Sequence, residues 1–123
     1  MCSSDLFSRS GQGAGVVRVR AIETPDRHLV DYEYRDGRYV RMRLERAGAW
    51  GFGATVHGRK GARSFTVDFA PVYTRLVEGM IGFFEGRPAP VDLRDIVETI
   101  AVLECGNRSI EANGAWIEMP AIA

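Results

Sequence analysis

The residues of this chain that are able to carry out chemistry are few and lie far apart in the sequence. His28 and His57 are the only histidines, and Cys105 is distant from both. This spacing does not supply the clustered ligands that a zinc site requires. His28 and Asp31 have the residue types of an acid–base pair, but residues three apart on a strand point to opposite faces of the sheet. These residues therefore do not predict a catalytic centre.

Nucleophilic catalysis and phosphate binding have equally little support. Ser109 and Cys105 have no neighbouring base in the sequence that would activate them. Gly11-Gln12-Gly13 lacks the third glycine of a dinucleotide-binding loop, and a strand rather than a helix is predicted to begin at Val16. We therefore expect no catalytic, cofactor-binding or metal-binding residue in this chain.

Length and composition predict one globular domain. The chain has 123 residues, 46% of them hydrophobic, and its 16 basic residues balance 16 acidic ones. A net charge near zero provides no long-range attraction to nucleic acid or to an anionic membrane, and no apolar run is long enough to cross a bilayer. Cys2 and Cys105 do not make a disulfide framework, and no secretory h-region is present, so we expect a reducing, cytoplasmic location.

The N-terminal segment is predicted to lie outside the folded domain. Residues 1–6 look like a translated sequencing adapter, which indicates that the natural reading frame is cut here; an ordinary serine-rich flexible terminus is the alternative. Glycine and serine continue to Gly15 and favour a loop. We assign residues 1–15 to a disordered or artefactual terminus and residues 16–123 to one domain.

Alternating apolar and polar residues predict five strands, followed by two helices and a short closing strand. The strands are expected at 16–21, 28–34, 39–45, 50–57 and 64–69, the helices at 72–84 and 92–112, and the closing strand at 116–119. Asp36-Gly37 predicts a tight hairpin between the second and third strands. The order predicts an α+β fold: a predominantly antiparallel open β-sheet of five to six strands, with two helices of the C-terminal half packed on one face.

The second helix is expected to pack on the sheet through its apolar stripe. Asp92 is a good N-cap and Asn113-Gly114 a good C-terminal signal. Ile100 is predicted to lie at the centre of the contact and Glu98 on the opposite, charged face. The predicted core face consists of Leu93, Ile96, Ile100, Leu103, Asn107 and Ile110.

The other face of the predicted sheet mixes aromatic and charged side chains. A solvated face with cross-strand ion pairs and an association surface both remain open interpretations, since arginine with exposed aromatic residues is typical of interfaces. Acidic residues on the same surface argue against nucleic acid. We expect a homo-oligomer formed through this face, with no nucleic-acid or membrane partner. The expected contact residues are Leu29, Tyr39, Arg41 and Arg43.

The order of several motifs resembles the C-terminal domain of Gfo/Idh/MocA oxidoreductases. A Val-x-Val-x-Ala strand precedes Asp31-Tyr32-Glu33-Tyr34-Arg35-Asp36-Gly37 and then Val56-His57-Gly58-Arg59-Lys60-Gly61. Tyr73-x-x-Leu76 and Phe83-Phe84-Glu85-Gly86-Arg87-Pro88-Ala89-Pro90-Val91 follow. The long helix ending near Arg108-Ser109, followed by Gly114 and an apolar strand, looks like the last element of that family. The resemblance covers about residues 16–119 and rests on the order and spacing of all these motifs together.

The resemblance implies a function for a larger protein. Members of the family carry a Rossmann domain for NAD or NADP, a Glu-Lys-Pro motif with the catalytic lysine and an Asp-x-x-x-His helix, and this sequence contains none of the three. It therefore implies the substrate-side and subunit-pairing domain of an NAD(P)-dependent oxidoreductase acting on a sugar, cyclitol or related alcohol, with this chain alone inactive. A free-standing, non-catalytic α+β binding or dimerisation module is the alternative.

The resemblance also implies one substrate-binding residue. Sugar and inositol dehydrogenases of the family often place an aromatic residue, commonly tyrosine, at the start of the strand that leads into the h-x-Gly-x-x-Gly turn. Trp50 occupies that position here. Tryptophan removes the tyrosine hydroxyl and enlarges the ring, so the resemblance does not carry over a hydrogen bond made by that hydroxyl. Packing of the Trp50 ring at the margin of the sheet is the alternative.

Overall fold

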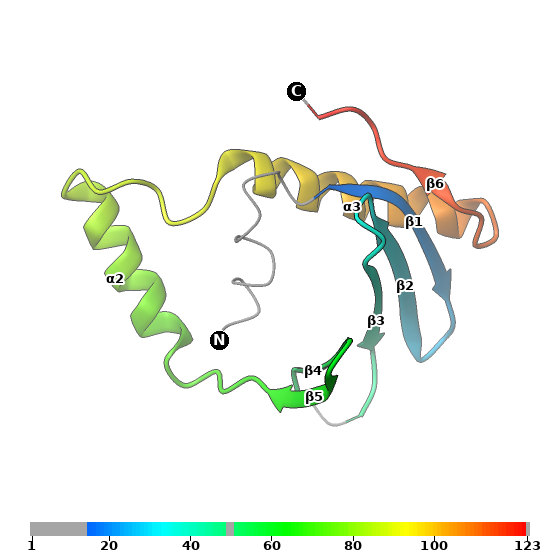
Figure 1. The fold of residues 1–123 in the computed structure, drawn as a ribbon, viewed down its shortest axis with the longest axis horizontal. Coiled ribbons are helices and arrows are strands. Elements are labelled where there is room, and N and C mark those ends of the chain that lie inside the picture. Colours follow the sequence, from blue (N-terminus) through cyan, green and yellow to red (C-terminus); the bar gives the residue numbers. More distant parts are fainter. Residues whose placement is uncertain (1–14, 49–50, 123) are drawn as a thin grey trace. The chain divides into compact units, whose positions relative to one another are not determined.

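The structure, a computed structural model, describes residues 15–48 and 51–122. Within these residues it contains six strands, in antiparallel sheets of four and two, and two helices (Figure 1). The predicted α+β class is confirmed. Where the sequence predicts one domain over 16–123, the chain divides by its contacts into two compact units. We call them the sheet unit (Met1–Ala47 with Val91–Ala123) and the hairpin unit (Gly48–Pro90).

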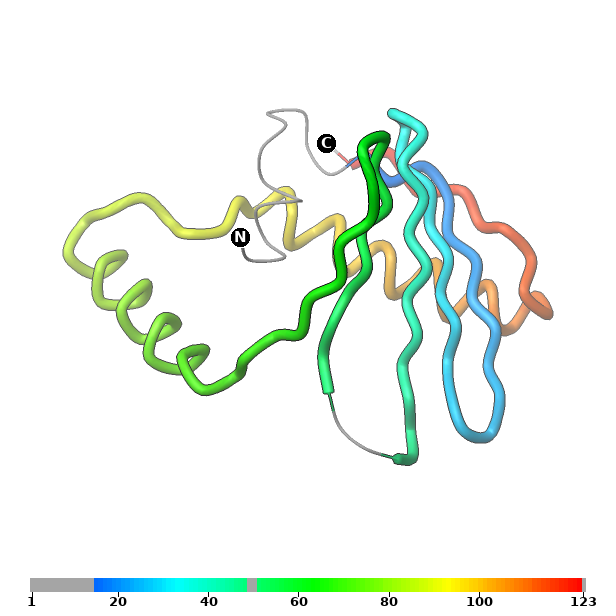
Figure 2. The backbone as a smooth tube through the Cα atoms, turned by 60° about the horizontal axis from the view of Figure 1, so that its bottom comes forward, coloured from blue at the N-terminus to red at the C-terminus, as the bar shows by residue number. Residues whose placement is uncertain are grey.

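The sheet unit is built on a four-stranded antiparallel sheet with the strand order β3-β2-β1-β6. Its strands are β1 (Val16–Glu23), β2 (Arg27–Tyr34), β3 (Tyr39–Glu45) and β6 (Ile117–Glu118). Figure 2 shows the three long strands side by side, with the helix α3 (Leu93–Glu111) behind them. The hairpin predicted between the second and third strands is present, since Gly37 has a φ of 87° and the Tyr34 N–H donates to the Arg38 carbonyl at 2.8 Å.

The core of this unit lies between the sheet and α3. Its buried residues are Val16, Val19, Tyr32, Tyr34 and Cys105. The register between β1 and β2 shifts at Val16–Arg18, an irregularity of the β-bulge kind. Val16 is therefore buried, whereas its neighbour Val17 is only half-buried.

The two ends of α3 agree with the prediction. The Asp92 side chain accepts a hydrogen bond from the Arg94 N–H at 2.9 Å, as an N-cap does. At the other end Asn113 and Gly114 have φ angles of 55° and 82°. The Gly114 N–H donates to the Ser109 carbonyl at 2.8 Å, which satisfies one of the carbonyls that the helix end leaves without a partner.

The face of α3 that packs on the sheet is not the predicted one. Ile100 is 60% exposed, whereas Glu98, predicted for the outer face, is 5% exposed. The prediction was wrong because the buried face carries Glu98 and Ser109, whose hydrogen bonds to the backbone of β1 an apolar pattern does not report. Gly106 lies against β1, where an added Cβ would be in ordinary van der Waals contact with the Ala21 Cβ, at 3.9 Å. The buried residues of α3 are Glu98, Cys105, Gly106 and Ser109.

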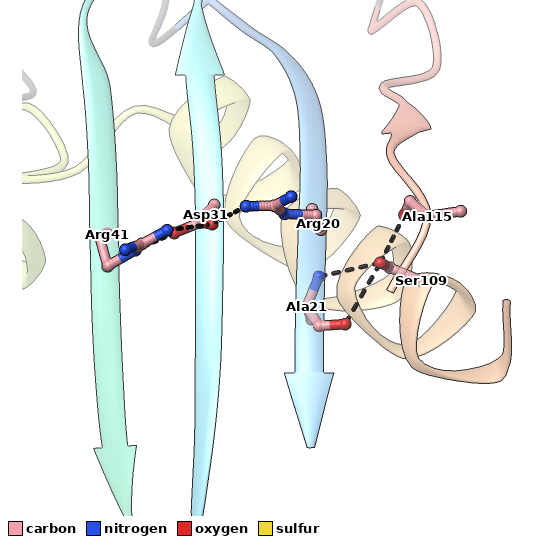
Figure 3. Close-up of polar contacts among 6 residues, drawn as sticks. All are labelled: Arg20, Ala21, Asp31, Arg41, Ser109 and Ala115. Carbon is pink, nitrogen blue, oxygen red and sulfur yellow. Dashed lines mark hydrogen bonds and ion pairs between the residues drawn. The ribbon is translucent and has the colours of Figure 1, made fainter. Parts of the chain in front are cut away.

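Two buried polar side chains join α3 to β1. The Glu98 carboxylate accepts hydrogen bonds from the Val16 N–H at 2.7 Å and the Gly15 N–H at 3.2 Å. The Ser109 hydroxyl accepts from the Ala21 N–H at 2.9 Å and donates to the Ala115 carbonyl at 2.6 Å (Figure 3). β6 pairs only with Arg18 and Val19 of β1, so the N–H groups of Val16 and Ala21 need other partners. Glu98 and Ser109 supply them, and these hydrogen bonds make burial of the two polar side chains favourable.

The hairpin unit contains β4 (Gly53–Gly58), β5 (Gly61–Thr66) and the helix α2 (Val72–Phe84). The hydroxyls of Thr55 and Ser64 lie 2.7 Å apart across the two strands. The rings of Phe52 and Phe69 have centroids 4.5 Å apart. Gly86 follows α2 with a φ of 91°, so the helix ends where the sequence predicts. Among the residues described in this unit, only Gly82 is buried.

Candidate functional site

The most distinctive surface of the sheet unit is the face of the sheet opposite α3, which we call the open face. Strand alternation brings to it the side chains that β1, β2 and β3 do not direct at the core. Asp31 and Glu33 of β2 lie between basic residues of the two neighbouring strands. The open face is defined by Arg18, Arg20, Leu29, Asp31, Glu33, Tyr39, Arg41, Arg43 and Trp116.

A charged triad lies across the middle of this face (Figure 3). Asp31 is in register with Arg20 on one side and with Arg41 on the other. Arg41 donates from Nε to Oδ1 at 2.7 Å and from Nη2 to Oδ2 at 2.9 Å, and Arg20 Nη2 donates to Oδ2 at 2.7 Å. The Asp31 side chain is only 6% exposed, with the two guanidinium groups against its carboxylate.

These contacts set the ionisation of the triad. Hydrogen bonds from Arg41, then from Arg20, hold the pKa of Asp31 well below its usual range, although burial acts in the opposite direction. The same carboxylate raises the pKa of Arg41. Asp31 is therefore a fixed negative charge, a poor proton donor or acceptor near neutral pH.

Further ion pairs continue on both sides of the triad. Arg18 Nε donates to Glu33 Oε2 at 2.6 Å, and this hydrogen bond lowers the pKa of Glu33. Glu45 contacts Arg43 and also Arg27, the latter at 3.6 Å. The cross-strand ion pairs that one of the two open interpretations of this face expects are therefore present, while association through the face stays a prediction.

Trp116 adds an aromatic surface that the sequence analysis did not assign to this face. The guanidinium carbons of Arg18 and Arg20 lie 4.5 and 5.0 Å from the centroid of its ring. Tyr39 approaches it edge-on, with ring centroids 6.5 Å apart. Ile117 packs against the core, so its neighbour Trp116 points the other way. The sequence alone does not report which way Ile117 points.

The sequence-predicted residues divide into three groups. Tyr39, Arg41 and Arg43 are exposed on the open face, and Leu29 is half-buried there. His57 belongs to β4 of the hairpin unit. Trp50, the candidate substrate-binding residue, lies outside the described residues, as do residues 1–14 with the adapter-like segment 1–6.

Neither helix fits the phosphate groups of a dinucleotide. A phosphate-binding helix opens in a glycine-rich loop whose N–H groups face the anion. Here Pro71 precedes α2, and the Asp92 carboxylate already accepts from the first turn of α3, where it would repel a phosphate. The part of the chain described by the structure contains no group of three His, Cys, Asp or Glu side chains arranged to hold a metal ion.

The comparisons with known proteins add no relative. Models of protein families, curated proteins and solved structures were compared with this chain, and none matches. Within the described residues, neither helix is long and apolar enough to span a membrane. The function is therefore inferred from the residues and their geometry.

Proposed function

We propose that this chain is the substrate-side and subunit-pairing domain of an NAD(P)-dependent oxidoreductase of the Gfo/Idh/MocA kind, acting on a sugar, cyclitol or related alcohol. The observation that carries the proposal is the open face, an antiparallel sheet surface that displays Trp116, Tyr39 and arginines while α3 covers the other side. This composition is typical of protein interfaces. The assignment to the Gfo/Idh/MocA family rests on the resemblance in motif order over residues 16–119.

The expected partner at the open face is a second copy of the chain. Carboxylates lie among the arginines of the face, with Asp31 held by Arg20 and Arg41 and Glu33 held by Arg18, so the surface is of mixed sign and would oppose part of the attraction to a polyanion such as a nucleic acid. A face of mixed sign is able to match itself across a two-fold axis, with the rings of Tyr39 and Trp116 providing apolar area. The proposal includes a cytoplasmic location, consistent with Cys105 as a buried free thiol.

Sedimentation velocity of the full chain tests the pairing. We expect the weight-average sedimentation coefficient to rise between about 1 and 100 μM, a range that brackets weak association. Tyr39→Glu should abolish the rise, because it places a charge in the apolar part of the open face. Charge reversal at Arg41 is less suitable, since it would leave the buried Asp31 beside a second carboxylate.

Tyr73→Glu is the matched control. Tyr73 is an exposed tyrosine of α2, and its replacement should leave the association unchanged. A wild-type chain that is monomeric at all concentrations would contradict the pairing. Equal effects of Tyr39→Glu and Tyr73→Glu would also contradict it.

The oxidoreductase part of the proposal has two direct tests. Calorimetry with NADH and NADPH should detect no binding tighter than about 10 μM, because neither helix start fits a phosphate. Reading the DNA upstream of the Met1 codon should reveal a continuous frame that encodes a Gly-x-Gly-x-x-Gly unit and a Glu-Lys-Pro motif. An in-frame stop codon directly upstream would contradict the proposal and favour a free-standing dimerisation module.

A further inference from the structure

A cavity of about 210 Å³ lies between the sheet and the first half of α3, entirely within the sheet unit. Side chains from three strands form one wall and residues of α3 form the other. The lining residues are Val16, Tyr32, Tyr34, Met42, Asp95, Glu98, Thr99, Val102 and Leu103. None of them is basic. The cavity therefore has an apolar lining whose only charged groups are the carboxylates of Asp95 and Glu98.

Glu98 is the unusual member of this lining. It is 5% exposed, and among the residues that the structure describes its carboxylate accepts hydrogen bonds from the N–H groups of Val16 and Gly15 alone. A carboxylate has room for about four such bonds. Among the described residues no arginine, lysine or histidine forms an ion pair with Glu98. Buried charges in proteins are usually paired, so this carboxylate has capacity for a cation.

The volume of the cavity limits the size of a ligand. A cavity of about 150 Å³ is sufficient for benzene in another protein. The present cavity therefore accommodates about one ring with a short arm. The apolar walls favour an apolar ligand, and the Glu98 carboxylate, which has no ion-pair partner among the described residues, favours one that carries a positive charge.

We propose that this cavity binds a small organic ammonium ion, a protonated amine on an apolar ring or short branched chain. The ammonium group donates to the free lone pairs of the Glu98 carboxylate, with Asp95 as a second negative charge. The apolar part contacts the Val16, Met42 and Val102 side chains. The site is on the helix-covered face of the sheet, so it is independent of the open face and of the oxidoreductase proposal.

Benzylamine is the probe, and benzyl alcohol and benzoate are its neutral and anionic counterparts. Titration of the full chain, followed by ¹H–¹⁵N NMR, should shift the amide signals of Gly15 and Val16, which donate to Glu98. We expect a Kd of about 0.1 to 1 mM for benzylamine, as for a ligand of this size. Benzyl alcohol should bind at least about tenfold more weakly, because it lacks a charge-assisted hydrogen bond to Glu98. Benzoate should not bind.

Two pairs of variants test the role of the carboxylate. Glu98→Gln removes the charge at nearly constant shape and should abolish the preference for amine over alcohol, while Glu104→Gln, an exposed residue of the same helix, should retain it. Leu103→Lys supplies an ammonium group from the lining itself and should remove benzylamine binding even if Glu98→Gln fails to fold. Leu93→Lys, exposed but outside the lining, should bind as the wild type does.

Three results would overturn the proposal. The first is the absence of shifts at Gly15 and Val16 with benzylamine. The second is equal binding of benzylamine and benzyl alcohol, which would make the site an apolar cavity only. The third is unchanged benzylamine binding by Leu103→Lys.

Discussion

The sheet unit and the hairpin unit have similarly apolar sequences but bury them to different extents. Val19 and Ala21 of the sheet unit are almost inaccessible to solvent, while Phe52, Phe69 and Phe84 of the hairpin unit are exposed. A two-stranded hairpin with one helix of 13 residues has too little surface to enclose a core of its own. The difference shows that an apolar pattern specifies the type of an element, whereas burial depends on the surface available to cover it.

The two units also differ in the burial of their polar side chains. Asp31, Glu98 and Ser109 are buried in the sheet unit, and each has partners on an adjacent element. The Thr55–Ser64 hydroxyl pair of the hairpin unit is exposed instead. Each buried polar group in the sheet unit restricts how α3 and the strands fit together, because leaving it unpaired costs free energy.

The largest expected difference in unfolding free energy between the units comes from the same substitution made at one valine in each unit. Val19→Ala should lower the free energy of unfolding by about 2 to 4 kcal/mol, since it removes fully buried methyl groups and leaves a cavity. Val77→Ala, on α2, should change it by less than about 0.5 kcal/mol. Urea unfolding of the full chain gives both values. Similar midpoints for the two variants would show that Val77 is as well covered in solution as Val19.

One serine in each unit tests whether buried hydrogen bonds stabilise the sheet unit more than exposed ones stabilise the hairpin unit. Ser109→Ala should cost about 1 to 3 kcal/mol, because it leaves the Ala21 N–H and the Ala115 carbonyl buried without a partner. Ser64→Ala removes a hydroxyl contact that water replaces and should cost less than about 0.5 kcal/mol. The same unfolding measurement applies. Equal losses of unfolding free energy for both variants would show that the buried Ser109 hydrogen bonds stabilise the protein no more than the exposed Ser64 contact does.

Local signals in the sequence were sufficient to locate the elements. Asp36-Gly37, Asp92 and Asn113-Gly114 predict turns and helix ends through backbone geometry and short-range hydrogen bonds, and all of them are found. The ion pairs on the open face were also predictable, since period-two alternation assigns their side chains to one face.

The packing face of α3 was not predictable in the same way. Its apolar stripe with Ile100 suggested one side, but the side that packs carries Glu98, Gly106 and Ser109. Their burial depends on backbone groups of β1 that are distant in sequence, and no local pattern reports such partners. Trp116 was missed for a related reason, because its face depends on the direction of Ile117 in β6.

A smaller effect, dependent on pH, is expected from the triad of the sheet unit. The folded-state pKa of Asp31 is depressed, so its stabilisation is complete above about pH 4, the usual aspartate pKa, and declines as the pH falls toward the lower folded value. Asp31→Asn should be less stable than the wild type by about 1 to 2 kcal/mol at pH 7, and this difference should narrow below about pH 4. Unfolding midpoints between pH 2 and 7, with Glu104→Gln as an exposed control, check this; a difference independent of pH would contradict it.

The smallest effect is expected at Ile100, where the sequence pattern predicts the opposite result. The side chain is 60% exposed, and alanine is the better helix former, so Ile100→Ala should change the free energy of unfolding by less than about 0.5 kcal/mol. A residue at the centre of a core contact would cost about 2 to 5 kcal/mol instead. Glu98→Ala, measured in parallel, should cost about 1 to 3 kcal/mol because the N–H groups of Gly15 and Val16 lose their acceptor. If Ile100→Ala lowers the urea midpoint more than Glu98→Ala does, the apolar face of α3 is covered in solution, and the apolar stripe rather than the polar anchors determines how the helix packs.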